Sequence, residues 1–293
     1  MTSSCRPCPA CGSSSSRDVR RFDEVGLLSC SECRLVYTAR RPSDHELGAW
    51  YSSYPIADHI SPITVDRLDE IVSSFEPYRR LGTLIDVGAG SGHLAQAAQR
   101  RGWTVHAVEY GPRQRDRLAA QGVLTHQPLL EGPRLEAGPF DVVVLQEVIE
   151  HMRDPARELH EVARILRPSG LLYVTCPNFA SLSCRMLGPR WRVVEYPEHL
   201  NYFTPATLRS CLARHGLHEV SVGTTGLSID DLRAVVPRRR CTPDHRSESV
   251  DERVRGATGR YRSLAALKRA TNEILTRFQL GDTIKGRYEP PPT

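Results

Sequence analysis

The sequence feature that most constrains the fold is an apolar run that ends in a glycine-rich turn, LIDVGAGSG at residues 84–92. Short continuous apolar runs are typical of buried parallel strands, and residues 93–101 after the turn have a helical pattern. Glycine permits positive φ, and free N–H groups at a helix start suit a polar or anionic ligand. A second strand, at 104–109, ends in Glu109, where nucleotide-binding α/β units place an acceptor for ribose hydroxyls.

Strands alternate with helices through the following core. The predicted strands are 83–87, 104–109, 122–125, 140–145, 170–176 and 217–224. This alternation favours an α/β fold with a parallel sheet, and ligands bind at the carboxyl ends of such strands. The residues that follow strands one, two, four and five are therefore the candidate site residues.

Four of the nine cysteines have the spacing of a metal site. Cys8 and Cys11 form one C-x2-C pair, and Cys30 and Cys33 form a second after 18 intervening residues. Two such pairs supply four thiolates for tetrahedral Zn²⁺, and a closed four-cysteine site is structural. Cys5 with Cys8 is another C-x2-C pair, and reduced thiols without metal are the alternative interpretation.

The composition of the chain disfavours several other classes of protein. Apolar residues make up 40% and charged residues 25% of the chain, and no apolar run is long enough to span a membrane. The N-terminus lacks the pattern of a signal peptide, which predicts a cytoplasmic location. A net charge of +5 permits an acidic substrate, but with 6% aromatic residues it disfavours nucleic acid as the partner.

Acids and imidazoles follow the fourth strand. Glu147, Glu150 and His151 lie within five residues, and a helical conformation would place all three on one face. Such a cluster holds a divalent cation or tunes a general base. Each residue also has an interpretation without a cation or a base. Glu147 would line the cofactor, Glu150 would cap a turn, and His199, which follows much later in the sequence, would be a packed histidine before a helix.

The G-x-G-x-G turn preceded by Asp86 resembles motif I of the class I S-adenosylmethionine-dependent methyltransferases, and the similarity runs from about residue 81 to residue 178. It implies a Rossmann-like seven-stranded sheet of order 3-2-1-4-5-7-6, with residues 281–288 as the last, antiparallel strand. It also implies S-adenosylmethionine as the cofactor. The cofactor-binding residues that we expect are Asp86, Gly88, Ala89, Gly90, Gly92, His93, Glu109, Tyr110, Gln127, Gln146 and Glu147.

The Glu-x-x-Glu-His run resembles two methyltransferase families in which it carries a divalent metal. These are the ubiquinone-pathway O-methyltransferases and the small-RNA 3′-terminal 2′-O-methyltransferases, and the latter use a further histidine that would fall at His199. The sugar C-methyltransferases of antibiotic pathways also join a zinc module to this core and use a Glu-His pair as the base. These resemblances imply that Glu150, His151 and His199 are catalytic, and that Glu147 joins them in a second site for an ion such as Mg²⁺.

The organisation that we predict is a zinc ribbon at 1–41, a helical linker or lid at 42–80, and a methyltransferase domain at 81–293 with a helical insertion at about 228–279. Aromatic and cationic residues after strand five suit an anionic or carrier-linked small molecule, with an ordinary exposed loop as the alternative. The expected substrate-binding residues are Arg190, Trp191, Tyr196 and Tyr202. The sequence does not indicate an oligomeric state.

The predicted function is methylation, preferably on oxygen, of a small molecule of specialised metabolism or of glycan or cofactor biosynthesis. C-methylation of a nucleotide-linked sugar or ring, RNA 2′-O-methylation and a non-catalytic zinc-ribbon adaptor that binds the cofactor are the alternatives.

Overall fold

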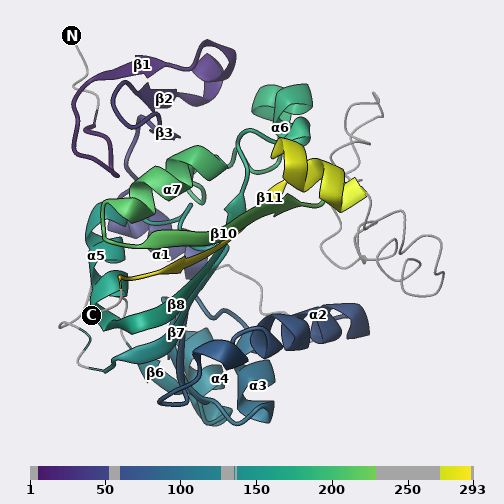
Figure 1. Ribbon diagram of the computed structural model, residues 1–293. Helices are drawn as coiled ribbons and strands as arrows, with labels where there is room; N and C mark the ends of the chain where they lie inside the picture. The colour runs from purple at the N-terminus through teal and green to yellow at the C-terminus, as the bar shows by residue number, and fades with distance from the viewer. Residues whose placement is uncertain (1–5, 53–59, 127–134, 136, 229–270, 292–293) are drawn as a thin grey trace.

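The computed structural model describes residues 6–52, 60–126, 135, 137–228 and 271–291. Its centre is a seven-stranded sheet in the order β10-β11-β8-β7-β4-β5-β6, with β11 antiparallel to both of its neighbours (Figure 1). Numbered within this sheet, the order is 3-2-1-4-5-7-6, so the predicted fold is confirmed. The strands are β4 Thr83–Val87, β5 Thr104–Val108, β6 Leu124–His126, β7 Phe140–Gln146, β8 Leu166–Pro177, β10 His218–Thr225 and β11 Thr283–Glu289.

The central strands are buried on both faces, which explains their continuous apolar sequences. Along β7, Val142 and Val144 pack against α2, α3 and α4, whereas Val143 and Leu145 pack against α5 and α7. Figure 1 shows these two groups of helices on opposite sides of the sheet. The α-helices are α1 Asp44–Ser52, α2 Pro62–Ser73, α3 His93–Arg100, α4 Pro112–Ala120, α5 Pro155–Ile165, α6 Leu182–Leu187 and α7 Pro205–Ala213.

Capping residues fix where several helices begin. Ser61, Asp154 and Thr204 each accept a hydrogen bond from a backbone N–H in the first turn of α2, α5 and α7, and a proline follows each of them. Within the predicted helical linker at 42–80, α2 ends at Ser73 and a separate 3₁₀ turn, Glu76–Tyr78, follows it.

A second sheet contains β1 Ser16–Asp18, β2 Leu27–Cys30, β3 Val36–Thr38 and β9 Asn201–Tyr202, in that order. We call β1 to β3 with their four cysteines the cysteine module. Its fourth strand comes from far along the chain, in a segment where the sequence pattern predicts no strand. The module packs against α7 through the core that it shares with one face of the large sheet (Figure 1).

The domain boundaries at residues 41, 80, 228 and 279 stay predictions. Most of the predicted insertion, residues 229–270, lies outside the described residues. Among the helices that the structure describes, none combines the length and the apolar character needed to cross a bilayer.

Candidate active site

The glycine-rich turn between β4 and α3 has the backbone conformation that its sequence predicts. Gly88, Gly90 and Gly92 all have positive φ, between 52° and 78°. A Cβ atom at Gly88 would lie 2.6 Å from a methyl carbon of Val148, so a larger residue does not fit there. The turn therefore depends on glycine both for its φ angles and for its close contact with the segment after β7.

Glu109 follows β5 and faces the glycine-rich turn. Its carboxylate accepts hydrogen bonds from Gly90 N at 2.8 Å and from Gly111 N at 3.0 Å. Asp86, on the adjacent strand β4, is buried, and both burial and the nearby Glu109 raise the pKa of its carboxyl to about 7. Two acids thus lie at the carboxyl ends of β4 and β5, beside the N-terminus of α3.

The segment after β7 is a turn, so the helix considered for 147–151 is absent. Glu147 has φ of 54°, which turns the chain away from the strand direction immediately. Its carboxylate accepts a 2.7 Å hydrogen bond from Thr175 Oγ1 on β8. Burial raises the pKa of Glu147, although the Thr175 hydroxyl and the charges of Arg67 and Lys285 oppose this.

Glu150, His151 and His199 lie together, and we call them the acid–histidine cluster. One potential ligand atom from each lies within 4.8 Å of the others. Glu147 is not part of this group, so the structure does not bring together the four-residue cation site that the sequence predicts. The carboxylate of Glu147 is instead hydrogen-bonded to Thr175 of β8.

Backbone carbonyls fix the tautomers of both histidines. His151 Nδ1 lies 2.9 Å from the carbonyl oxygen of Glu198, and His199 Nδ1 lies 2.6 Å from that of Val193. Because a carbonyl only accepts, each Nδ1 carries a proton, and in the neutral imidazole the lone pair then lies on Nε2. His151 Nε2 is 3.8 Å from Glu150 Oε1, and the two ring centroids are 4.7 Å apart.

Burial controls the charge of this cluster. Both carboxylate oxygens of Glu150 are buried without a hydrogen bond to another described residue, and burial, assisted by Glu147, raises the pKa of Glu150 well above its usual range. Burial and the neighbouring His199 lower the pKa of His151 to about 3. An imidazole with so low a pKa is a weak base at neutral pH, but it retains the lone pair that a metal ligand needs.

The four cysteines of the module converge as predicted. Their sulfur atoms all lie within 4.8 Å of one another, with Cys8 Sγ 3.5 Å from Cys33 Sγ and Cys11 Sγ 3.6 Å from Cys30 Sγ. Tetrahedral Zn²⁺ with bonds of about 2.3 Å would place its sulfur ligands about 3.8 Å apart. The four sulfur atoms therefore fit a structural zinc ion.

Comparison with known proteins decides the family. A family model described as a methyltransferase domain matches residues 66–222, which is more than half of the 293 residues. The chain belongs to this methyltransferase family. Membership confirms the similarity to class I S-adenosylmethionine-dependent methyltransferases that the sequence indicated.

Curated relatives include two named ubiquinone biosynthesis O-methyltransferase. The protein from Caulobacter vibrioides is 32% identical over 164 residues, covering 50% of this chain and 63% of the relative. The one from Caulobacter sp. (strain K31) is 33% identical over 147 residues, covering 44% and 57%. The chain thus spans about three fifths of the length of these relatives.

Two solved structures show the same fold. The [4+2]-cyclase SpnF has 17% identity and a TM-score of 0.53, covering 86% of this chain and 97% of its own. A putative sarcosine dimethylglycine methyltransferase from Galdieria sulphuraria has 16% identity and a TM-score of 0.51, covering 85% and 98%. At these identities the similarity extends to the fold alone.

The predicted substrate residues of the methyltransferase do not lie together on an open surface. Trp191 and Tyr202 are only 2% and 3% exposed, and they pack with Phe22 and Leu187 in a core to which β2 and β3 of the cysteine module also contribute. Apolar packing between distant segments buries both side chains, and substrate contact by them stays a prediction. Arg190 is exposed and Tyr196 is half-buried under the guanidinium of Arg40, and their substrate role stays a prediction.

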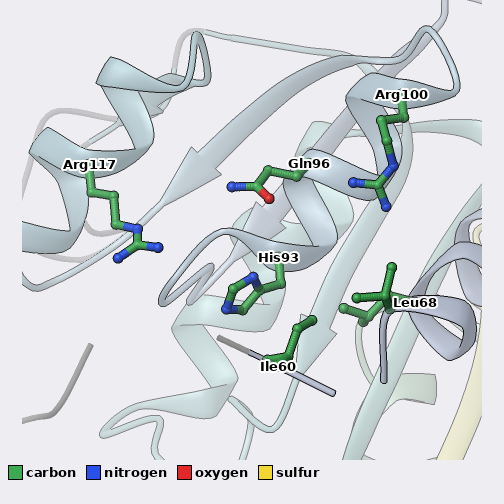
Figure 2. Close-up of a pocket in the computed structure, with 7 residues that line it drawn as sticks. Ile60, Leu68, His93, Gln96, Arg100 and Arg117 are labelled. Carbon is green, nitrogen blue, oxygen red and sulfur yellow. The ribbon is translucent and has the colours of Figure 1, made fainter. Parts of the chain in front are cut away.

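The remaining cofactor candidates are placed at the same edge of the sheet. Gln146 ends β7, and its buried Oε1 has no partner among the described residues. Ala89 and Tyr110 follow β4 and β5 directly, whereas Gln127 lies outside the described residues. His93, the first residue of α3, also lines a cavity of about 230 Å³ between α2, α3 and α4. Figure 2 shows it there with Gln96 and Arg100 of α3 and Arg117 of α4.

Two functional candidates have no signal in the local sequence. Thr175 binds Glu147 across neighbouring strands, and Asn201 contacts the turn that carries Glu150, although 51 residues separate the two. An internal threonine of a strand and an asparagine in a loop are ordinary residues when read alone. Only the pairing of β7 with β8, and of β3 with β9, makes them part of the site.

Proposed function

We propose that the methyltransferase transfers a methyl group from S-adenosylmethionine to an oxygen atom of a small molecule, assisted by a divalent cation at the acid–histidine cluster. One observation carries the proposal. Two histidines whose Nε2 atoms are not held by the backbone carbonyls converge with a carboxylate that is buried without a hydrogen-bonding partner in the described part of the chain, beside the glycine-rich turn of a methyltransferase core. The O-methyltransferase relatives support the choice of oxygen and a role in cofactor biosynthesis.

The cofactor would bind at the carboxyl ends of β4 and β5. When bound, S-adenosylmethionine supplies the electrophilic methyl group, so the protein contributes mainly position. We assign the ribose hydroxyls to Glu109 and the close approach of the cofactor to Gly88 and Gly90. Glu109 would exchange its present hydrogen bonds to the glycine-rich turn for bonds to the cofactor.

The cation would be held by Glu150, His151 and His199. When bound, it supplies Lewis acidity that favours loss of the proton from an acceptor hydroxyl. Two imidazoles and one carboxylate suit Mn²⁺, Fe²⁺ or Co²⁺ better than Mg²⁺, which prefers oxygen ligands in octahedral geometry. The donor set therefore fits a transition ion, and it fits Mg²⁺ only if further oxygen ligands come from substrate or water.

A second candidate is C-methylation of a nucleotide-linked sugar. The cysteine module joined to the methyltransferase core favours it, as does the sugar-enzyme resemblance noted for the sequence. That reaction requires a base that removes a proton from carbon, and the low pKa of His151, about 3, weakens this assignment. The two candidates therefore differ in whether activity needs a cation.

The test is a methyl-transfer assay with radiolabelled S-adenosylmethionine on hydroxylated aromatic acceptors and on nucleotide-linked sugars. We expect transfer to oxygen that a chelator abolishes and that Mn²⁺ or Co²⁺ restores. His199→Ala should reduce turnover at least tenfold, whereas His160→Ala, at an exposed position of α5, should not. Chelator-resistant methylation of a sugar carbon would support the second candidate instead, and cofactor binding without any transfer would support a non-catalytic adaptor.

A further inference from the structure

The segment that carries His199 is joined to the cysteine module by backbone hydrogen bonds. Two residues after His199, β9 pairs antiparallel with β3 over two residue pairs. Thr38 N, at the end of β3, also donates a 3.0 Å hydrogen bond to Leu200 O. The module is therefore hydrogen-bonded to one side of the segment that carries His199 of the acid–histidine cluster.

The other side of the same segment holds the turn after β7. The carbonyl oxygen of Glu150 accepts from Leu200 N at 2.8 Å and from Asn201 N at 3.0 Å. The side-chain amide of Asn201 donates to Met152 O at 2.7 Å, and Asn201 is only 1% exposed. The 198–201 segment thus lies between β3 of the module and the turn that carries the other two cluster residues.

The position of β3 depends in turn on the cysteine site. Cys30 ends β2, Cys33 lies in the β2–β3 connection, and Cys30 N donates a 2.9 Å hydrogen bond to Leu35 O just before β3. So short a module has little apolar core of its own, so metal binding at the four cysteines would contribute to the folding free energy that holds β2 and β3 in place. Its buried cysteines also belong to the apolar core that contains Ile149 and Met152 of the turn.

We propose that the cysteine site and Asn201 act as positioning elements for the acid–histidine cluster, so that occupancy of the cysteine site sets how tightly the cluster binds its cation. The inference rests on the cation site proposed above. Outer residues that orient metal ligands have the same effect elsewhere, and their loss typically weakens metal binding about 10–100-fold. Here the Asn201 amide joins the segment that carries one histidine ligand to the turn that carries the other two ligands, and in this way it orients all three.

The first test is titration of the zinc-loaded, full-length protein with Mn²⁺, followed by electron paramagnetic resonance. Asn201→Ala removes the amide donor to the turn, and we expect Mn²⁺ affinity to fall about 10–100-fold. The affinity for S-adenosylmethionine, measured by calorimetry, should stay at the wild-type value, because the side-chain amide of Asn201 donates to the turn after β7 and not to the glycine-rich turn. Unchanged Mn²⁺ affinity in this variant would overturn the proposal.

Thr38→Val is the matched control. Thr38 is equally buried in the same sheet, but its hydroxyl donates to Arg40 O rather than to the cluster segment. This variant keeps the backbone hydrogen bond from Thr38 N, so we expect wild-type Mn²⁺ affinity. An equal loss of affinity in both variants would mean that general loosening of the sheet, and not Asn201, controls the cluster.

The second test needs neither cation nor acceptor, so it separates this inference from the proposed function. Hydrogen–deuterium exchange is compared between the wild type and Cys11→Ser, which removes one thiol of the cysteine site. We expect faster exchange in peptides that cover 149–152 and 198–203, with unchanged protection at 84–109. If both site peptides keep wild-type protection, the cysteine site does not position the cluster. If the wild type binds no Mn²⁺ while exchange follows the expectation, the cation proposal fails and the positioning role stands.

Discussion

At the scale of single residues, Glu109 is the most direct test of the cofactor site. Glu109→Ala removes the carboxylate proposed to accept from the ribose, together with two hydrogen bonds that order the turn. Hydrogen bonds to a charged group contribute roughly 1.5–3 kcal/mol, so calorimetry should show S-adenosylmethionine affinity about 10–100-fold weaker. The control is Glu76→Ala, which breaks only an ion pair with Arg79. Wild-type affinity in Glu109→Ala would remove the ribose assignment.

Glu158 of α5 gives a stability prediction that is independent of the site. Burial raises the pKa of this carboxyl to about 7, so the folded protein holds its proton more tightly than the unfolded chain does. The resulting stabilisation is complete below the unfolded pKa and is lost as the pH rises through about 7. A shift of this size corresponds to roughly 2–3 kcal/mol between pH 5 and pH 8.

Glu158→Gln should remove that pH dependence, because glutamine does not ionise and can still accept the hydrogen bond from Asp154 N. Urea unfolding of the wild type and of the variant at pH 5 and pH 8 is the measurement. We expect the variant to be the more stable protein at pH 8, by a margin that shrinks toward pH 5. Glu161→Gln, at a partly exposed position on the same helix, should follow the wild type. If the free energy of unfolding of Glu158→Gln changed with pH as much as that of the wild type, the prediction would be contradicted.

The local sequence predicted where some site residues lie and failed for others, and each outcome has a physical reason. The turn at Gly88 and Gly90 and the acid at Glu109 follow from local requirements, since positive φ and the end of a strand are encoded within a few residues. The carboxylate of Glu147 is hydrogen-bonded to Thr175 of a neighbouring strand, which sequence spacing does not reveal. The burial of Trp191 depended on distant segments, and an aromatic residue in a polar loop gives no sign of it.

At the scale of elements, the large sheet was predictable because its central strands are apolar and alternate with helices along the chain. Strand order followed from the family resemblance and was confirmed in full. β9 was not predictable, because a strand of two residues has no periodicity and exists only through pairing with β3. This short strand connects the cysteine module to the segment that carries His199, so the missed element is also the one on which the proposed positioning role rests.

At the scale of the whole molecule, one apolar core extends from the cysteine module through α7 and α5 to one face of the large sheet. The sequence presents the module as a separate unit, since its cysteines all precede residue 41. The structure gives it two connections to the methyltransferase core, through the shared core and through β9. A metal bound at the four cysteines would therefore be linked to the candidate site through this core and through β9.

The central claim is that this methyltransferase uses a divalent cation at Glu150, His151 and His199, in addition to structural zinc at the four cysteines. The most direct measurement is elemental analysis of the purified protein before and after dialysis against a chelator, with methyl transfer measured on the same samples. We predict one retained zinc per chain and a second, exchangeable divalent ion that is lost together with activity. One tightly bound zinc, no second ion and full activity after dialysis would contradict the claim.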